Sequence, residues 1–192
     1  MKSLRIMLSV ALLSLSAMAF AQHDAQKTNA PKSDAQKSFD KLKTLAGTWE
    51  GHGTTNPPVP DMPDIMQINL QVTSSGNALK HEMMGKPKTN GKDADHPITM
   101  VYLEGDRLLL THYCDAGNRP RMAARVSPDG NTVEFDFVDV SGGTKYGHMD
   151  HAVFTIIDTN HHTEDWTYLM PGDKPMHAHI DLQRVNQQTA AR

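Results

Sequence analysis

Phe39-Asp-Lys-Leu-Lys-Thr-Leu-Ala-Gly-Thr-Trp-Glu-Gly-His-Gly53 contains two signals on which the rest of the fold depends. The first is a set of three apolar residues at helical spacing, Phe39, Leu42 and Leu45, which predicts a short amphipathic helix. The second is a strand that opens on Trp49, with Gly47 before it and Gly51 after it. Glycine lets backbones approach closely and a large aromatic ring fills space. We therefore expect these three residues to be structural and to close the base of a β-barrel, with Trp49 as the plug.

The rest of the chain alternates short strand patterns with turn residues such as Gly105-Asp106 and Pro128-Asp129-Gly130-Asn131. Strands are predicted at 48–53, 66–72, 78–84, 98–104, 107–114, 121–127, 132–140, 148–157, 162–170 and 176–185. This series predicts an all-β fold, a single antiparallel up-and-down β-barrel of about ten strands with a short N-terminal helix. A β-sandwich is the alternative, but a barrel leaves no exposed edge strand.

The N-terminus has the features of a signal peptide. Lys2 and Arg5 precede a short apolar run, which ends in the small-x-small site Ala19-Phe20-Ala21. An uncleaved membrane anchor is the alternative, but the run is shorter than the ~20 apolar residues that a spanning helix needs. We expect cleavage after Ala21 and export to the periplasm or the extracellular space.

The chain is thereby expected to have four segments: a signal peptide at 1–21, a flexible leader at 22–37, a barrel domain at 38–186 and a disordered tail at 187–192. The leader and the tail contain no aromatic residue and bury too little apolar surface to order themselves. Ser38 is the predicted N-cap of the short helix.

Composition excludes several functions. The chain has 192 residues and a formal net charge of −3, with its basic residues scattered, so we expect no nucleic-acid binding and no stable membrane insertion. Cys114 is the only cysteine, so no internal disulfide is possible. The motifs of common hydrolases and phosphate-binding enzymes are absent, which favours a non-enzymatic role and leaves the question of activity open.

Several predicted strands carry polar side chains on the same face as apolar ones, which suits a lumen that admits a ligand. The candidate ligand-binding residues are His112, Arg119, Arg121, His151, Trp166 and Tyr168. The two arginines are expected at the barrel mouth, where they could meet a ligand carboxylate. The expected partner is a small apolar or amphipathic molecule. The alternative is that these polar faces meet water, as they do in many antiparallel sheets.

His177 and His179 form the sharpest metal-binding pattern. Residues two apart on a strand point the same way, so both imidazoles could reach one zinc or iron ion, or a haem iron. A third ligand could come from the neighbouring predicted strands, which carry His148, His151, His161 and His162. A buried histidine with an ordinary hydrogen bond is the alternative.

The two ends of the domain carry a family resemblance. Leu45–Gly53 and the closing segment Pro175-Met-His-Ala-His-Ile-Asp-Leu-Gln-Arg-Val185 resemble those of the calycin-like barrels. These include lipocalins, fatty-acid-binding proteins and the nitrobindin-like group. The resemblance implies a secreted lipocalin-like barrel with a ligand in its lumen. The nitrobindin-like members imply haem as a cofactor, with His179 as the axial ligand.

Three functional hypotheses follow from the sequence. The first is an exported, non-enzymatic protein that binds an apolar or amphipathic molecule in its lumen. The second is a nitrobindin-like haem protein that uses His179. The third is a metal-dependent enzyme that uses the pair His177 and His179.

Overall fold

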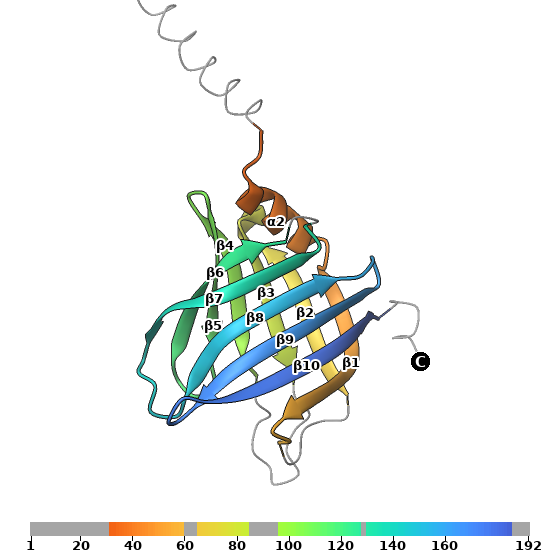
Figure 1. Ribbon diagram of the computed structural model, residues 1–192. Coiled ribbons are helices and arrows are strands. Elements are labelled where there is room, and N and C mark those ends of the chain that lie inside the picture. The colour runs from red at the N-terminus through yellow and green to blue at the C-terminus, as the bar shows by residue number, and fades with distance from the viewer. Residues whose placement is uncertain (1–30, 60–64, 85–95, 128–129, 186–192) are drawn as a thin grey trace, which may run out of the picture. The chain divides into compact units, whose positions relative to one another are not determined.

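The computed structural model describes residues 31–59, 65–84, 96–127 and 130–185 (Figure 1). Ten strands form one closed antiparallel barrel, in which each strand pairs with its neighbours in sequence and β1 pairs with β10. The predicted all-β barrel with one short helix is confirmed. Ring closure rules out the sandwich, because it leaves no free sheet edge between β1 and β10.

The elements follow one another along the chain with short connections. Their bounds are α2 (Asp34–Lys43), β1 (Gly47–Asn56), β2 (Met66–Thr73), the 3₁₀ turn η1 (Ser74–Gly76), β3 (Ala78–Met84), β4 (Ile98–Glu104), β5 (Arg107–Tyr113), β6 (Arg119–Val126), β7 (Thr132–Ser141), β8 (His148–Ile156), β9 (His161–Met170) and β10 (Lys174–Arg184).

The helix begins earlier than predicted. Ser33 is its N-cap, and the Ser33 hydroxyl accepts a hydrogen bond from the backbone N–H of Gln36 at 3.2 Å. Ser38, the predicted cap, lies inside the helix, where its hydroxyl donates to the carbonyl oxygen of Asp34 at 2.7 Å. Residues 33–37, which the sequence placed in a flexible leader, therefore belong to the helix and its cap, and residues 22–30 of the expected leader lie outside the described residues. The prediction failed because the polar residues 33–37 were assigned by composition alone.

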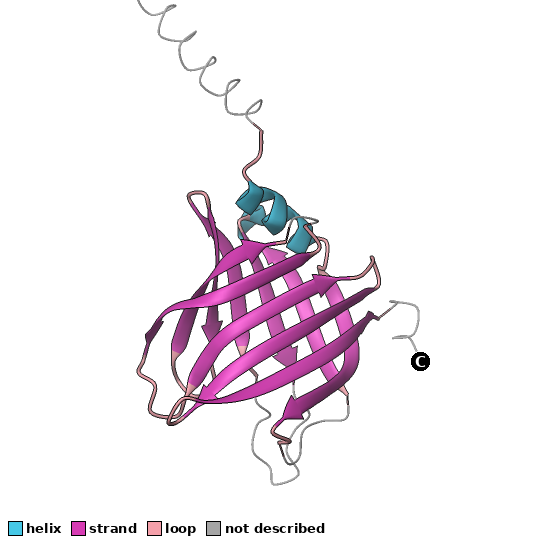
Figure 2. Cartoon of the chain, in the orientation of Figure 1, coloured by secondary structure: helices cyan, strands magenta, loops and turns pink. Residues whose placement is uncertain are grey.

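One end of the barrel is closed as the sequence predicted. Phe39, Leu42 and Leu45 are buried against Trp49, which has no exposed surface. The indole N–H of Trp49 donates to the carbonyl oxygen of Leu45 at 2.7 Å, so the plug is also tied to the segment after α2. Figure 2 shows α2 lying across this end of the strands.

Arg184, the last residue of β10, completes the closed end. Its guanidinium lies 4.1 Å from the centroid of the Trp49 ring and donates to the carbonyl oxygens of Thr44, Ala46 and Thr159. Burial lowers the pKa of Arg184 from its usual value. Its contacts join the turn after α2 to the end of β10 and so help to fix the closure of the barrel.

The two predicted structural positions, Gly47 and Gly51, require glycine for different reasons. Gly47 has a φ of 144°, which L side chains rarely adopt, and a Cβ atom there would collide with the Arg184 guanidinium. Gly51 has no unusual φ, but a Cβ atom there would overlap the backbone carbonyl oxygen of Asp181 on β10. A side chain at Gly47 would strain the backbone and displace the Arg184 guanidinium, whereas a side chain at Gly51 would require the backbone of β10 to shift.

Two strand boundaries and two irregular pairings differ from the prediction in ways that matter for side-chain direction. β1 continues to Asn56, and β6 begins at Arg119, which the sequence placed in a connection. The strand pairing is irregular between Arg121 and Met122 in β6, and between Met149 and His151 in β8. An irregularity of this kind changes which alternate residues face inward.

α2, at 10 residues, and the 3₁₀ turn η1 are the helices of the described part of the chain. Neither is long and apolar enough to cross a membrane.

A polar site inside the barrel lumen

The lumen is apolar next to α2. β1 starts directly after α2 and the strands alternate in direction, so odd strands begin and even strands end at this side. The buried inward-facing residues here are Trp49, Leu70, Leu79, Leu108, Val133 and Leu182. This half is an ordinary packed core that closes one end of the lumen.

A row of polar residues crosses three adjacent strands further along the lumen. His81 on β3 pairs with Thr99 on β4, and Thr99 pairs with His112 on β5. All three are buried. Each alternates along its strand with other inward-facing residues, so its side chain also points into the lumen. Three polar side chains in one row of a barrel interior are unusual, since buried polar groups cost free energy unless they are hydrogen-bonded.

Glu164 on β9 is a fully buried carboxylate with three donors around it. His81 Nε2 lies 2.9 and 3.1 Å from its two oxygens, His162 Nε2 lies at 3.1 Å, and Trp166 Nε1 lies at 3.0 Å. Burial on its own raises the pKa of Glu164, but the charge and hydrogen bonds of His81 and His162 hold this pKa well below its usual range. Glu164 is therefore ionised, and its negative charge is stabilised inside the barrel by the donors of His81, His162 and Trp166.

The Glu164 carboxylate determines which ring nitrogen of His81 and of His162 carries a hydrogen. An ionised carboxylate only accepts hydrogen bonds, so the Nε2 atoms of both His81 and His162 must carry hydrogen and donate. The Nδ1 atoms of the same two rings are buried and have no hydrogen-bond partner within the described residues. The lumen therefore holds two nitrogens with unused hydrogen-bonding capacity.

His112 offers a third nitrogen. Its Nδ1 lies 2.8 Å from the Thr99 hydroxyl, and none of the described groups forms a hydrogen bond with its Nε2. Burial, with a smaller contribution from the charge of His81, lowers the pKa of His112 to about 4, so the ring is neutral at pH 7. The Trp166 ring lies 5.6 Å from the ring of His81 and 5.7 Å from that of His112, between centroids.

Beyond this polar group, the inward-facing side chains retain solvent-accessible surface. They are Met83, Met149, Tyr168, Met176 and Ala178, near the strand ends far from α2. Met149 and Met176 both pair with Tyr168, so the three form one row across β8, β9 and β10. The lumen is thus accessible to solvent on this side, and the polar group forms its floor.

Three of the six predicted ligand-binding residues face the lumen, and three do not. His112, Trp166 and Tyr168 face inward. Arg119 and Arg121 lie on the outer face, where Arg119 Nε donates to the Ser141 hydroxyl at 3.3 Å and Arg121 Nη2 lies 2.6 Å from an oxygen of Asp139. Their outward direction follows from Pro120 and Met122, the alternate residues, which are buried.

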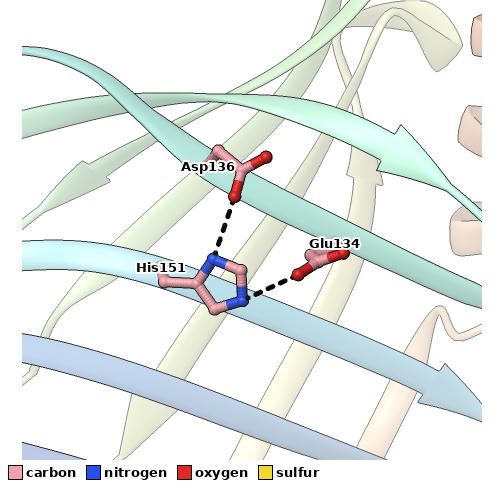
Figure 3. A group of neighbouring side chains, drawn as sticks. All are labelled: Glu134, Asp136 and His151. Atoms are coloured by element: carbon pink, nitrogen blue, oxygen red, sulfur yellow. Dashed lines mark ion pairs between the residues drawn. The ribbon is translucent and has the colours of Figure 1, made fainter.

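His151 also lies on the outer face, between two carboxylates of β7. Figure 3 shows its ring between Glu134 and Asp136, and its two nitrogens lie 3.3 Å from an oxygen of each. The ligand atoms of these three residues lie within 4.8 Å of one another, which is close enough for a metal ion. Arg125 already forms ion pairs with both carboxylates, so a positive charge is present without a metal.

His177 and His179 point away from the lumen. They line a shallow outer hollow of about 370 Å³ between β1, β9 and β10. His179 Nδ1 lies 2.6 Å from an Asp165 oxygen, and His177 Nδ1 lies 3.1 Å from the Thr167 hydroxyl. A haem or metal held by His179 would therefore sit on the outside of the barrel, where Ile180 and Leu182 show the inward face to be the opposite one.

The sequence-based prediction did not include His81, Thr99 or Glu164 among the ligand-binding residues. A signal for His81 was present, because it alternates with Leu79 and Met83 and so shares the face of two apolar residues. Glu164 alternates with Trp166 in the same way. Nothing in the spacing shows that the two residues meet, since they are far apart in sequence and on opposite walls.

No family model and no curated protein matches the chain. Among solved structures, it is similar to Rv2717c from M. tuberculosis, with a TM-score of 0.54 and 14% identity, covering 78% of this chain and 98% of that one. It is also similar to a protein of unknown function from the DUF3598 family of Nostoc punctiforme PCC 73102, with a TM-score of 0.48 and 12% identity, covering 75% of this chain and 49% of that one. At these identities the likeness shows the fold alone.

Proposed function

We propose that the protein is an exported, non-enzymatic binding protein that holds a small apolar or amphipathic molecule in its barrel lumen. One observation carries the proposal. The inward-facing side chains beyond the polar floor, among them Met149, Tyr168 and Met176, remain partly exposed although they belong to the inside of a closed barrel. A lumen filled by its own side chains would bury these positions.

The chemistry of the walls supports the same proposal. Methionine is flexible and polarisable, so a lining that contains Met83, Met149 and Met176 can adapt to an apolar molecule. The unused nitrogens of His81 and His112 offer polar contacts at the floor. Binding sites for small molecules commonly combine apolar walls with a few such polar groups.

The described residues do not favour the haem or metal hypotheses over this one. His177 and His179 lie outside the lumen, and both Nδ1 atoms are engaged by neighbouring polar side chains.

Export rests on the signal-peptide pattern, and N-terminal sequencing of the secreted protein should give Gln22 as the first residue.

Two measurements test lumen binding. Native mass spectrometry of the protein from its exporting host should show a bound small molecule. The neutral apolar dye N-phenyl-1-naphthylamine should become fluorescent on binding. Ala178→Phe, which adds a ring on the inward face of β10, should weaken dye binding at least about tenfold.

The matched control is Gln183→Phe, on the exposed outer face of the same strand, which should leave dye binding unchanged. Equal dye affinity in Ala178→Phe and the wild type, with no co-purifying molecule, would rule out the lumen as the binding site.

A further inference from the structure

The floor of the lumen has hydrogen-bonding capacity but no spare charge. His81 Nδ1 is buried without a partner, and His112 Nε2 on the same cross-strand row is likewise unused. Glu164, the buried anion, already accepts from two imidazoles and from Trp166. A cationic group entering the lumen would therefore find no anion left to pair with.

Free positive charge is also missing at the floor, because the imidazoles of His81 and His162 are both engaged with the Glu164 carboxylate. Arg119, Arg121 and Arg125 form their contacts on the outer face. Arg184 faces inward at the closed end, but its guanidinium is used on the Trp49 ring and on backbone carbonyls. Lys174 is the exposed first residue of β10, about 13 Å along the strand from Ala178 at ~3.3 Å per residue.

His112 does not supply the missing charge. Its ring is buried, its pKa is about 4, and its Nδ1 is engaged with the Thr99 hydroxyl. At pH 7 its Nε2 can form a hydrogen bond but cannot balance a negative charge. A charged head group at this depth would lose its hydration without gaining an opposite charge, which is strongly unfavourable.

We infer that the ligand has an uncharged hydrogen-bonding head group, such as a hydroxyl, which lies at the row His81, Thr99 and His112 with an apolar body between the methionines. This rests on the proposed lumen binding. It narrows the ligand class from amphipathic molecules in general to neutral ones such as long-chain alcohols, and it excludes fatty acids and amines of the same length.

The test compares three amphiphiles with the same chain: 1-dodecanol, dodecanoate and dodecylammonium. Each is used at pH 7 to displace N-phenyl-1-naphthylamine from the full chain. Dodecanol should displace the dye at a concentration at least tenfold lower than either charged molecule. Preference for dodecanoate or dodecylammonium, or equal displacement by all three, would overturn the inference and leave lumen binding intact.

Two variants locate the head group. His112→Phe should weaken dodecanol about tenfold while the dye still binds, and Thr99→Val should weaken it by a smaller factor because it frees the His112 ring. The control, His161→Phe, changes a histidine that pairs with Asp181 on the outer face and should have no effect. Unchanged dodecanol binding in both folded lumen variants would overturn the inference. A wild type that takes up neither the dye nor any amphiphile would overturn lumen binding as well.

Discussion

Gly51 lies where the backbone of β10 closely approaches that of β1. A Cβ atom there would overlap the carbonyl oxygen of Asp181, and backbone cannot rotate away as a side chain can. Gly51→Ala should therefore lower the free energy of unfolding by at least about 3 kcal/mol, the upper end of the usual cost of overpacking. Urea unfolding followed by tryptophan fluorescence measures the change.

The control is Gly105→Ala, at a turn with open space around the added atom. Its φ of 60° is left-handed, so alanine should cost only about 1–2 kcal/mol there. Equal losses at the two positions would mean that β1 and β10 are not as close as the structure has them.

His112 makes stability depend on pH. Its pKa is about 4 in the folded protein and 6.5 in an unperturbed chain, so between these values the unfolded state binds a proton that the folded state does not. Stability contributed by neutral His112 is complete above pH 6.5 and is lost as pH falls towards 4. The full loss is about 3 kcal/mol, from the difference of the two pKa values.

The measurement is the free energy of unfolding of wild type and His112→Gln between pH 7 and pH 4. The wild type should lose about 3 kcal/mol more than the variant over this range. The pKa of Glu164 is also lowered, so its protonation destabilises both proteins as pH falls further. This effect cancels when the two free energies of unfolding are compared. Parallel curves would show that His112 is not a buried neutral group.

The buried polar residues mark a limit of sequence reasoning at this scale. Alternation along a strand shows that His81 shares a face with Leu79, but it cannot show that Glu164 lies opposite His81 in the closed barrel. A buried imidazole and a buried carboxylate are each unfavourable alone and acceptable together. Their partnership depends on a contact between residues that are 83 positions apart.

The helix α2 illustrates the scale of single elements. Ser33 caps it through a hydrogen bond from Gln36 N–H. Ser33→Ala should destabilise the protein by about 1 kcal/mol, whereas Ser33→Asp should be nearly neutral because aspartate caps equally well. Thermal unfolding by circular dichroism measures both. Equal melting temperatures for all three proteins would show that α2 is capped in another way.

The strands show what alternation can and cannot give. It correctly grouped His177 and His179 on one face of β10. It could not say which face is inner, because the lumen of a ligand-binding barrel can also carry polar side chains. In β8, the irregular pairing between Met149 and His151 places these two residues on opposite sides, although regular alternation would place residues two apart on the same side.

At the scale of the whole molecule, α2 should be part of the folding unit. Phe39, Leu42 and Leu45 belong to the same buried cluster as Trp49. A chain that starts at Pro31 should melt cooperatively at the temperature of the full chain, as judged by circular dichroism. A chain that starts at Leu45 lacks two of these buried side chains, each worth about 2–5 kcal/mol, and should melt far lower or fail to fold.

The chain that starts at Leu45 keeps all ten strands, so a lower melting temperature can be attributed to the loss of the helix. Similar melting of both shortened chains would show that the strands close without the helix, and that α2 is an accessory to the barrel.

The sequence by itself determined the number and order of the strands and the closed end around Trp49, because these depend on local spacing and on residues near one another in the chain. Only the tertiary structure decided which face of each strand lies inside. It placed Arg119, Arg121 and His151 outside and brought His81, His112 and Glu164 together within. The physical reason is that burial is a property of the closed ring: a strand face becomes interior only when nine other strands surround it.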